Sequence, residues 1–249
     1  MAFFEYSYQW LAYVGSGVGA ALAYAVSGAL FKRHAERRSP ITRNLSWMVF
    51  LLGTAATVDF TFFSFKPFMG ELQQFVITLG TNISFTCSAT SNLLLFLFTL
   101  DVFADGRKSV PAWFVLGAEA FSAATLIPLY LAGLDSLPVL VVHLAASFAI
   151  YSSLAKAAFK LRGRLRDEGR AGSVELNPLA WMGASGILFF TAISLFLAHE
   201  VFLLLAIREY WTVTFGWITG SVAGFCTYVG YVVPEWAKRR WSSAGGKTF

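Results

Sequence analysis

Residues 179–207 read LAWMGASGILFFTAISLFLAHEVFLLLAI and are apolar almost throughout. A helix of about 20 apolar residues spans the hydrocarbon core of a bilayer, which is ~30 Å thick. This stretch therefore predicts a transmembrane helix. It also carries His199 and Glu200 near its far end. Because ionisable groups are costly inside a membrane, this pair is a candidate functional site.

The rest of the chain has the composition of a membrane protein. Of its 249 residues 57% are hydrophobic and 13% are charged, against about 25% charged in an average soluble domain. No polar stretch is long enough for a separate soluble domain. We therefore predict one all-α domain that crosses the cell membrane several times, with the lipid bilayer as its partner. The net charge of +5 lies in loops, where membrane topology explains it, and does not indicate nucleic-acid binding.

Seven apolar segments predict a bundle of seven transmembrane helices joined by short loops. Their expected bounds are 10–31, 45–65, 71–102, 112–131, 137–161, 179–207 and 211–233. Lysine and arginine concentrate in every second loop and in the tail, and only Lys66 and Arg208 fall on the other side. Since basic residues mark cytoplasmic loops, the N-terminus is expected outside and the C-terminus in the cytoplasm.

Four ionisable residues on three of these segments are expected at one depth. Counted at 1.5 Å per residue, each lies ~9–10 Å below the outer surface. Segment 71–102 is polar over about half its circumference, and its Thr78 and Asn82 reach the same depth. The sequence thus predicts an outward-facing polar pocket that binds a small ligand. Its ionisable residues are Asp59, His143, His199 and Glu200.

Two further polar features lie deeper. A second face of segment 71–102 carries Thr81, Ser84, Ser88 and Ser91, which places this helix in the centre of the bundle. Glu119 and Lys156 are expected at similar depths on the cytoplasmic side. They form a buried ion pair there unless Lys156 extends to the surface.

Three classes of function fit the predicted pocket. A receptor or sensor would bind a small ligand or a proton, since unperturbed histidine titrates near neutrality. A redox subunit would bind b-type haem axially through His143 and His199, or hold a quinone. A transporter would use the same residues for a small substrate or protons. A metal site is a further alternative, because two histidines and a carboxylate suit zinc. No tight ligand spacing such as HxxxH supports it.

Two small-residue motifs favour helix packing over catalysis. Residues 183–186 spell GASG, the GxSG pattern of intramembrane serine proteases, but His199 lies ~21 Å along the helix from Ser185. That separation allows no contact between a nucleophile and its base, so the sequence favours a protein that is not an enzyme. Gly216, Gly220 and Gly224 form two GxxxG steps, which let a helix approach closely within the bundle, or from a second copy or a partner.

Residues 90–106, TSNLLLFLFTLDVFADG, and residues 116–119, LGAE, resemble the third and fourth helices of microbial opsins. The resemblance implies a seven-helix bundle with the N-terminus outside. It also implies a retinal-binding lysine on the last helix and an aspartate four residues before it, whereas this chain has Gly220 and Gly224 at the corresponding spacing. The basic residue and the counter-ion expected midway along the third helix are absent. An opsin-like bundle of this sequence is therefore expected not to hold retinal by a Schiff base, nor to pump ions by that chemistry.

Overall fold

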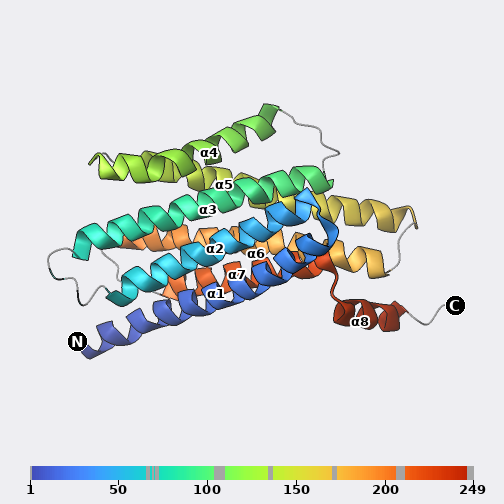
Figure 1. Cartoon of the computed structure of the whole chain (residues 1–249), viewed down its shortest axis with the longest axis horizontal. Coiled ribbons are helices and arrows are strands. Elements are labelled where there is room, and N and C mark those ends of the chain that lie inside the picture. The colour runs from blue at the N-terminus through green and yellow to red at the C-terminus, as the bar shows by residue number, and fades with distance from the viewer. Residues whose placement is uncertain are drawn as a thin grey trace.

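The computed structural model describes residues 2–65, 68, 70, 73–103, 110–133, 137–169, 173–205 and 211–245. These residues form eight α-helices and no strand (Figure 1), which confirms the predicted all-α class. The helices are α1 (Ala2–Arg37), α2 (Pro40–Phe65), α3 (Gln73–Phe103), α4 (Val110–Leu131), α5 (Leu137–Asp167), α6 (Ser173–Leu204), α7 (Trp211–Val232) and α8 (Glu235–Gly245).

Several helices extend beyond the apolar segments that predicted them. α1 already begins at Ala2, α5 continues to Asp167, and α6 begins at Ser173. Pro178, which was expected just before this helix, therefore lies inside it. The prediction followed hydropathy alone, whereas charged residues such as Glu, Lys and Arg are good helix formers and continue a helix into water.

Six helices within the described residues, α1 to α6, are long and apolar enough to cross a membrane. The chain is thus a multi-pass helical membrane protein. α7 has 22 residues, as many as α4, but does not belong to these six. Its glycine, serine and threonine residues lower its hydropathy.

Six of the helices form a closed ring, and α4 packs on the outside of that ring. The neighbours around the ring are α1, α2, α3, α5, α6 and α7, with α7 returning to α1. α4 contacts α3 and α5, and it lies at the edge of the bundle in Figure 1. A cavity inside the ring is therefore bounded by the six ring helices.

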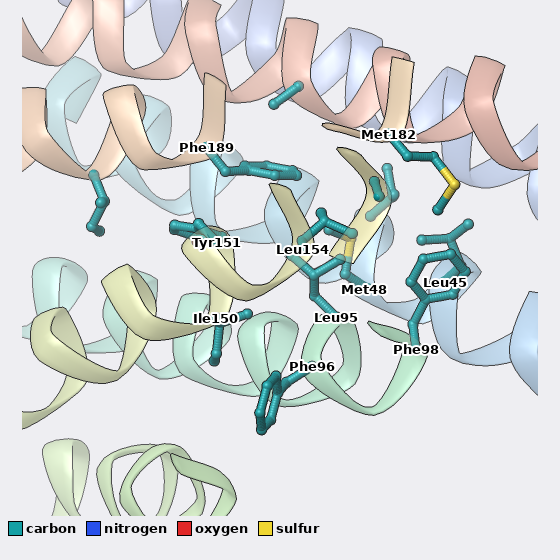
Figure 2. Packing of buried hydrophobic residues seen from close by; sticks show 14 of the residues in the cluster. Leu45, Met48, Leu95, Phe96, Phe98, Ile150, Tyr151, Leu154, Met182 and Phe189 are labelled. Carbon is teal, nitrogen blue, oxygen red and sulfur yellow. The ribbon is translucent and has the colours of Figure 1, made fainter. Parts of the chain in front are cut away.

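Apolar side chains fill the end of the ring at which α1 ends and α2 begins. Leu45, Met48, Leu95, Phe98 and Leu154 are almost completely buried there and pack together in Figure 2. Lipid is as apolar as these side chains, so in a membrane they stabilise the fold by close packing and not by leaving water.

Hydroxyl side chains add hydrogen bonds between neighbouring helices. Ser91 Oγ on α3 donates to the carbonyl of Met48 on α2 over 3.0 Å, and Ser185 Oγ on α6 donates to the carbonyl of Ala223 on α7 over 2.9 Å. Ser185 also bonds the hydroxyl of Thr227. The serine of the GxSG pattern is therefore engaged in the contact between α6 and α7.

A short amphipathic helix, α8, follows the bundle and was not anticipated from the sequence. Val233 has a φ of 50°, which turns the chain at Pro234. Trp241 of α8 is buried together with Val229 of α7. On the exposed side, Lys238 donates a hydrogen bond of 2.8 Å to Glu235, and this contact lowers the pKa of the Glu235 carboxyl.

Candidate functional site

A cavity of about 350 Å³ lies inside the ring of helices. All six ring helices contribute to its wall, and α4 does not. The lining residues are Gly19, Ala23 and Val26 of α1; Val49, Leu52 and Asp59 of α2; Thr81, Ser84, Phe85 and Ser88 of α3; Tyr151 of α5; Phe189, Ala192, Ile193, Phe196 and His199 of α6; and Val213, Trp217, Gly220, Ser221, Gly224 and Phe225 of α7.

Aromatic rings form much of the cavity wall. Phe196 packs edge-on against Trp217 with ring centroids 5.1 Å apart, and Tyr151 stacks on Phe189 at 5.2 Å. Figure 2 shows Tyr151 and Phe189 close together between α5 and α6. A Cβ atom added at Gly224 would meet no atom within 4 Å, so this glycine leaves open space beside the rings. The cavity therefore offers an apolar space bounded by flat ring surfaces.

Polar groups of the wall come chiefly from α2, α3 and α6. The indole N–H of Trp217 donates to Asp59 Oδ2 over 3.2 Å, and His199 Nδ1 lies 3.4 Å from the hydroxyl of Thr212. Asp59 and His199 both lie in the second half of their helices, and α2 and α6 run in the same direction in the alternating bundle. The cavity thus combines an apolar body with polar groups towards the end at which α2 and α6 terminate.

The structure brings only part of the predicted pocket together. Asp59 and His199 line one cavity, as the depth argument expected. Thr78 and Asn82 do not line it: Asn82 donates to the carbonyl of Thr78 over 2.9 Å along α3. The neighbouring polar face of α3 supplies the lining hydroxyls instead. Glu200 belongs to α6, but its side chain lies outside the described part of the structure.

His143 lies in different surroundings from His199. Its Nδ1 atom is 2.8 Å from Glu119 Oε2, both side chains are fully buried, and His143 is not part of the cavity wall. The structure therefore does not direct His143 and His199 into one cavity from opposite sides, as axial ligation of a haem by both would require. Within the described residues, no three His, Cys, Asp or Glu side chains gather closely enough to hold a metal ion.

A buried polar network surrounds Glu119 where α4 packs on α3 and α5. Asn92 Nδ2 donates to Glu119 Oε1 over 3.2 Å, Ser147 Oγ lies 3.3 Å from the same oxygen, and Tyr151 donates to Asn92 Oδ1 over 2.6 Å. Glu119 thus pairs with His143 and not with Lys156, which is exposed. Lys156 follows the alternative expectation of a side chain that extends to the surface.

The glycines of α7 face the interior of the ring. Gly216 is buried, and a Cβ added there would lie 2.8 Å from the ring of Phe196. Gly220 and Gly224 line the cavity. The absence of a side chain allows α6 to pack closely at Gly216 and keeps the cavity open at Gly220 and Gly224.

Sequence reasoning missed the aromatic wall, although a signal for it exists. Phe189, Ile193, Phe196 and His199 follow helical spacing, so one apolar face of α6 leads to the histidine. The face of α7 that carries Trp217 could have been identified from the sequence in the same way. Neither face stands out by composition, because large apolar residues also occur on the other sides of both helices.

Comparisons of the chain with protein-family models, with curated proteins and with solved structures found no match. The fold and the site define a class: a multi-pass helical membrane protein with a cavity inside its bundle. The chemistry of that cavity carries the functional conclusion.

Proposed function

We propose that this chain is a receptor- or sensor-like membrane protein that binds an apolar small molecule inside its helix ring. The observation that carries this proposal is the cavity of about 350 Å³ with a mostly apolar, aromatic wall. Small-molecule sites typically occupy about 300–1,000 Å³ and combine such walls with a few polar groups that fix orientation. The cavity has both properties.

The wall also indicates the kind of ligand. Ring faces such as those of Phe189 and Trp217 favour a flat or rod-shaped molecule with conjugated or ring character. Asp59 and His199 suit a hydroxyl, carbonyl or amino group at one end of that molecule. No lysine is found among the described residues of the wall, so the binding we propose is non-covalent.

A cavity-filling variant tests this proposal. Gly224→Leu places a side chain in the open space of the cavity, and we expect it to weaken binding of the rod-shaped fluorophore diphenylhexatriene at least about tenfold. Overpacking a filled site costs about 1–3 kcal/mol, and 1.4 kcal/mol corresponds to a factor of ten. The measurement is saturable energy transfer from tryptophan to the fluorophore, corrected for empty micelles.

Gly28→Leu is the matched control for that experiment. Gly28 is exposed on α1, and a Cβ added there also meets no atom within 4 Å. This variant should bind the fluorophore as the wild type does. The proposal fails if the wild type shows no saturable binding, or if Gly224→Leu binds as tightly as Gly28→Leu.

We also propose that α7 is a seventh membrane crossing and that the N-terminus lies outside and the C-terminus in the cytoplasm. α7 is long enough to span and packs between α1 and α6. Three of its small residues, Gly220, Ser221 and Gly224, line the cavity. Together with its other glycine and threonine residues they lower its hydropathy. The basic residues at the ends of α1 and α5 and on α8 support the orientation. An opsin-like arrangement, as the sequence resemblance implies, has the same number of membrane crossings and the same orientation.

Epitope tags at the two ends of the chain test this topology. In right-side-out membrane vesicles, an antibody should reach the N-terminal tag directly and the C-terminal tag only after permeabilisation. An odd number of crossings requires this difference. Tags that are reached on the same side would contradict both the count and the orientation.

A further inference from the structure

The contact between Glu119 and His143 joins two ionisable groups inside the membrane-spanning part of the bundle. His143 Nδ1 and Glu119 Oε2 are 2.8 Å apart, and neither side chain is exposed. His143 Nε2 is buried and has no hydrogen-bond partner. An unpaired buried polar atom is costly and points to a function or to a ligand that binds there. A proton is the smallest ligand that this nitrogen accepts.

The surroundings of the pair are polar but bring no second charge to it. Glu119 accepts a hydrogen bond from the neutral Asn92 of α3 and lies beside the hydroxyl of Ser147 of α5. The phenol of Tyr151 donates to Asn92 and not to the pair itself. The described ion pairs bring no second charged residue to either group. A proton on Nε2 makes the pair neutral overall, and an unbalanced charge at this depth is costly.

Two aromatic residues connect this pair to the cavity. Tyr151 lines the cavity and donates to Asn92, which in turn donates to Glu119. Phe85 also lines the cavity, and its ring centroid is 5.9 Å from that of His143 in an edge-on arrangement. A cation near a phenyl ring is attracted to the ring. Both connections therefore end in the cavity wall.

We propose that Nε2 of His143 binds a proton reversibly and that this proton is coupled to ligand binding in the cavity through Phe85 and Tyr151. The coupling rests on the ligand-binding function proposed above, whereas the proton site does not. When the proton binds, the imidazolium draws the ring of Phe85 towards α5 and leaves more room in the cavity. The ligand and the proton then favour each other, and each changes the affinity of the other by the same factor.

The coupling is tested by binding of diphenylhexatriene across pH 5 to 8. We expect the wild type to bind the fluorophore at least about fivefold more tightly at the acid end, because allosteric couplings typically amount to about 5–150-fold. Glu119→Gln and His143→Gln should bind with no pH dependence. His34→Gln, at the surface end of α1, and His199→Gln, in the cavity wall, should keep the pH dependence even if His199→Gln binds less tightly.

Several outcomes overturn the proposal. They are equal affinity of the wild type at all pH values, tighter binding at alkaline pH, pH dependence that survives in Glu119→Gln or in His143→Gln, and pH dependence that only His199→Gln removes. The last outcome would assign the effect to the cavity histidine.

A measurement without any ligand tests the proton site by itself. The chain has 3 histidines, so protein labelled with ¹⁵N-histidine gives few ring signals, and His143→Gln identifies those of His143. We expect Nε2 of His143 to gain and lose a proton reversibly while the fold stays intact. A ring that keeps one protonation state throughout would overturn the proton site. Failure of the fluorophore to bind the wild type at any pH, with a His143 that titrates, would instead overturn the cavity function and the coupling.

Discussion

Gly186→Ala is expected to lower the midpoint of thermal unfolding by several degrees. A Cβ atom at this position would lie 2.7 Å from the backbone nitrogen of Ala155 and 2.8 Å from the carbonyl oxygen of Tyr151. Backbone atoms cannot turn away as a side chain does, so α5 and α6 must separate. Overpacking of this kind costs about 1–3 kcal/mol, and each kcal/mol lowers the midpoint by about 2–4 °C for a chain of this size. Circular dichroism of the purified protein in detergent, followed during heating, measures the midpoint of unfolding.

The control is the same substitution at an open position. Gly28→Ala meets no atom within 4 Å and should leave the midpoint unchanged or raise it slightly, because alanine is the better helix former. If Gly186→Ala melted like Gly28→Ala, the close contact between α5 and α6 would be wrong. The stacking of Tyr151 on Phe189 would then lose its basis as well.

Glu119→Leu is expected to destabilise the protein by about 3–5 kcal/mol, the typical cost of removing one partner from a buried pair. The change leaves the buried imidazole of His143 without its carboxylate partner. It also removes one of the two acceptors of the Asn92 amide nitrogen, which keeps only its hydrogen bond to Ser147. α4 is held to the ring through this network, so its attachment should loosen first. Unfolding in detergent, followed by circular dichroism, gives the loss of stability.

The double variant Glu119→Leu with His143→Leu provides the comparison for that experiment. Apolar groups that replace both partners leave fewer polar groups unpaired, so the double variant should be more stable than the sum of the two single losses predicts. Strictly additive losses would show that the two side chains do not interact. The pair would then have no role in holding α4.

Hydropathy predicted the helices of the bundle because lipid imposes a simple rule on each of them. A spanning segment must be apolar for about 20 residues, and the six apolar helices of the structure follow this rule. Segment 211–233 was also predicted, and α7 occupies it, but glycine and threonine residues make this helix less apolar than the other six. The rule says nothing about α8, whose charged and tryptophan residues lie outside the apolar segments.

The candidate site was harder to predict because rotation about a helix axis is not encoded in an apolar sequence. Depth counting grouped Asp59, His143 and His199, yet His143 faces α4 and the other two face the cavity. Depth counting also treats helices as straight and parallel, whereas α4 and α5 diverge in Figure 1. Residues counted to different depths, such as Glu119 and His143, therefore meet.

The most direct test of the central claim is to map where an apolar ligand lies in the bundle. A rod-shaped fatty alcohol with a diazirine group can be cross-linked to the wild-type protein by light, and mass spectrometry then identifies the labelled residues. We predict saturable labelling of the cavity wall at Phe189, Phe196 and Trp217. An excess of the alcohol without the diazirine group should suppress this labelling. Labelling confined to lipid-facing residues such as Phe114 and Ile187, with no saturable label in the wall, would contradict a ligand site inside the ring.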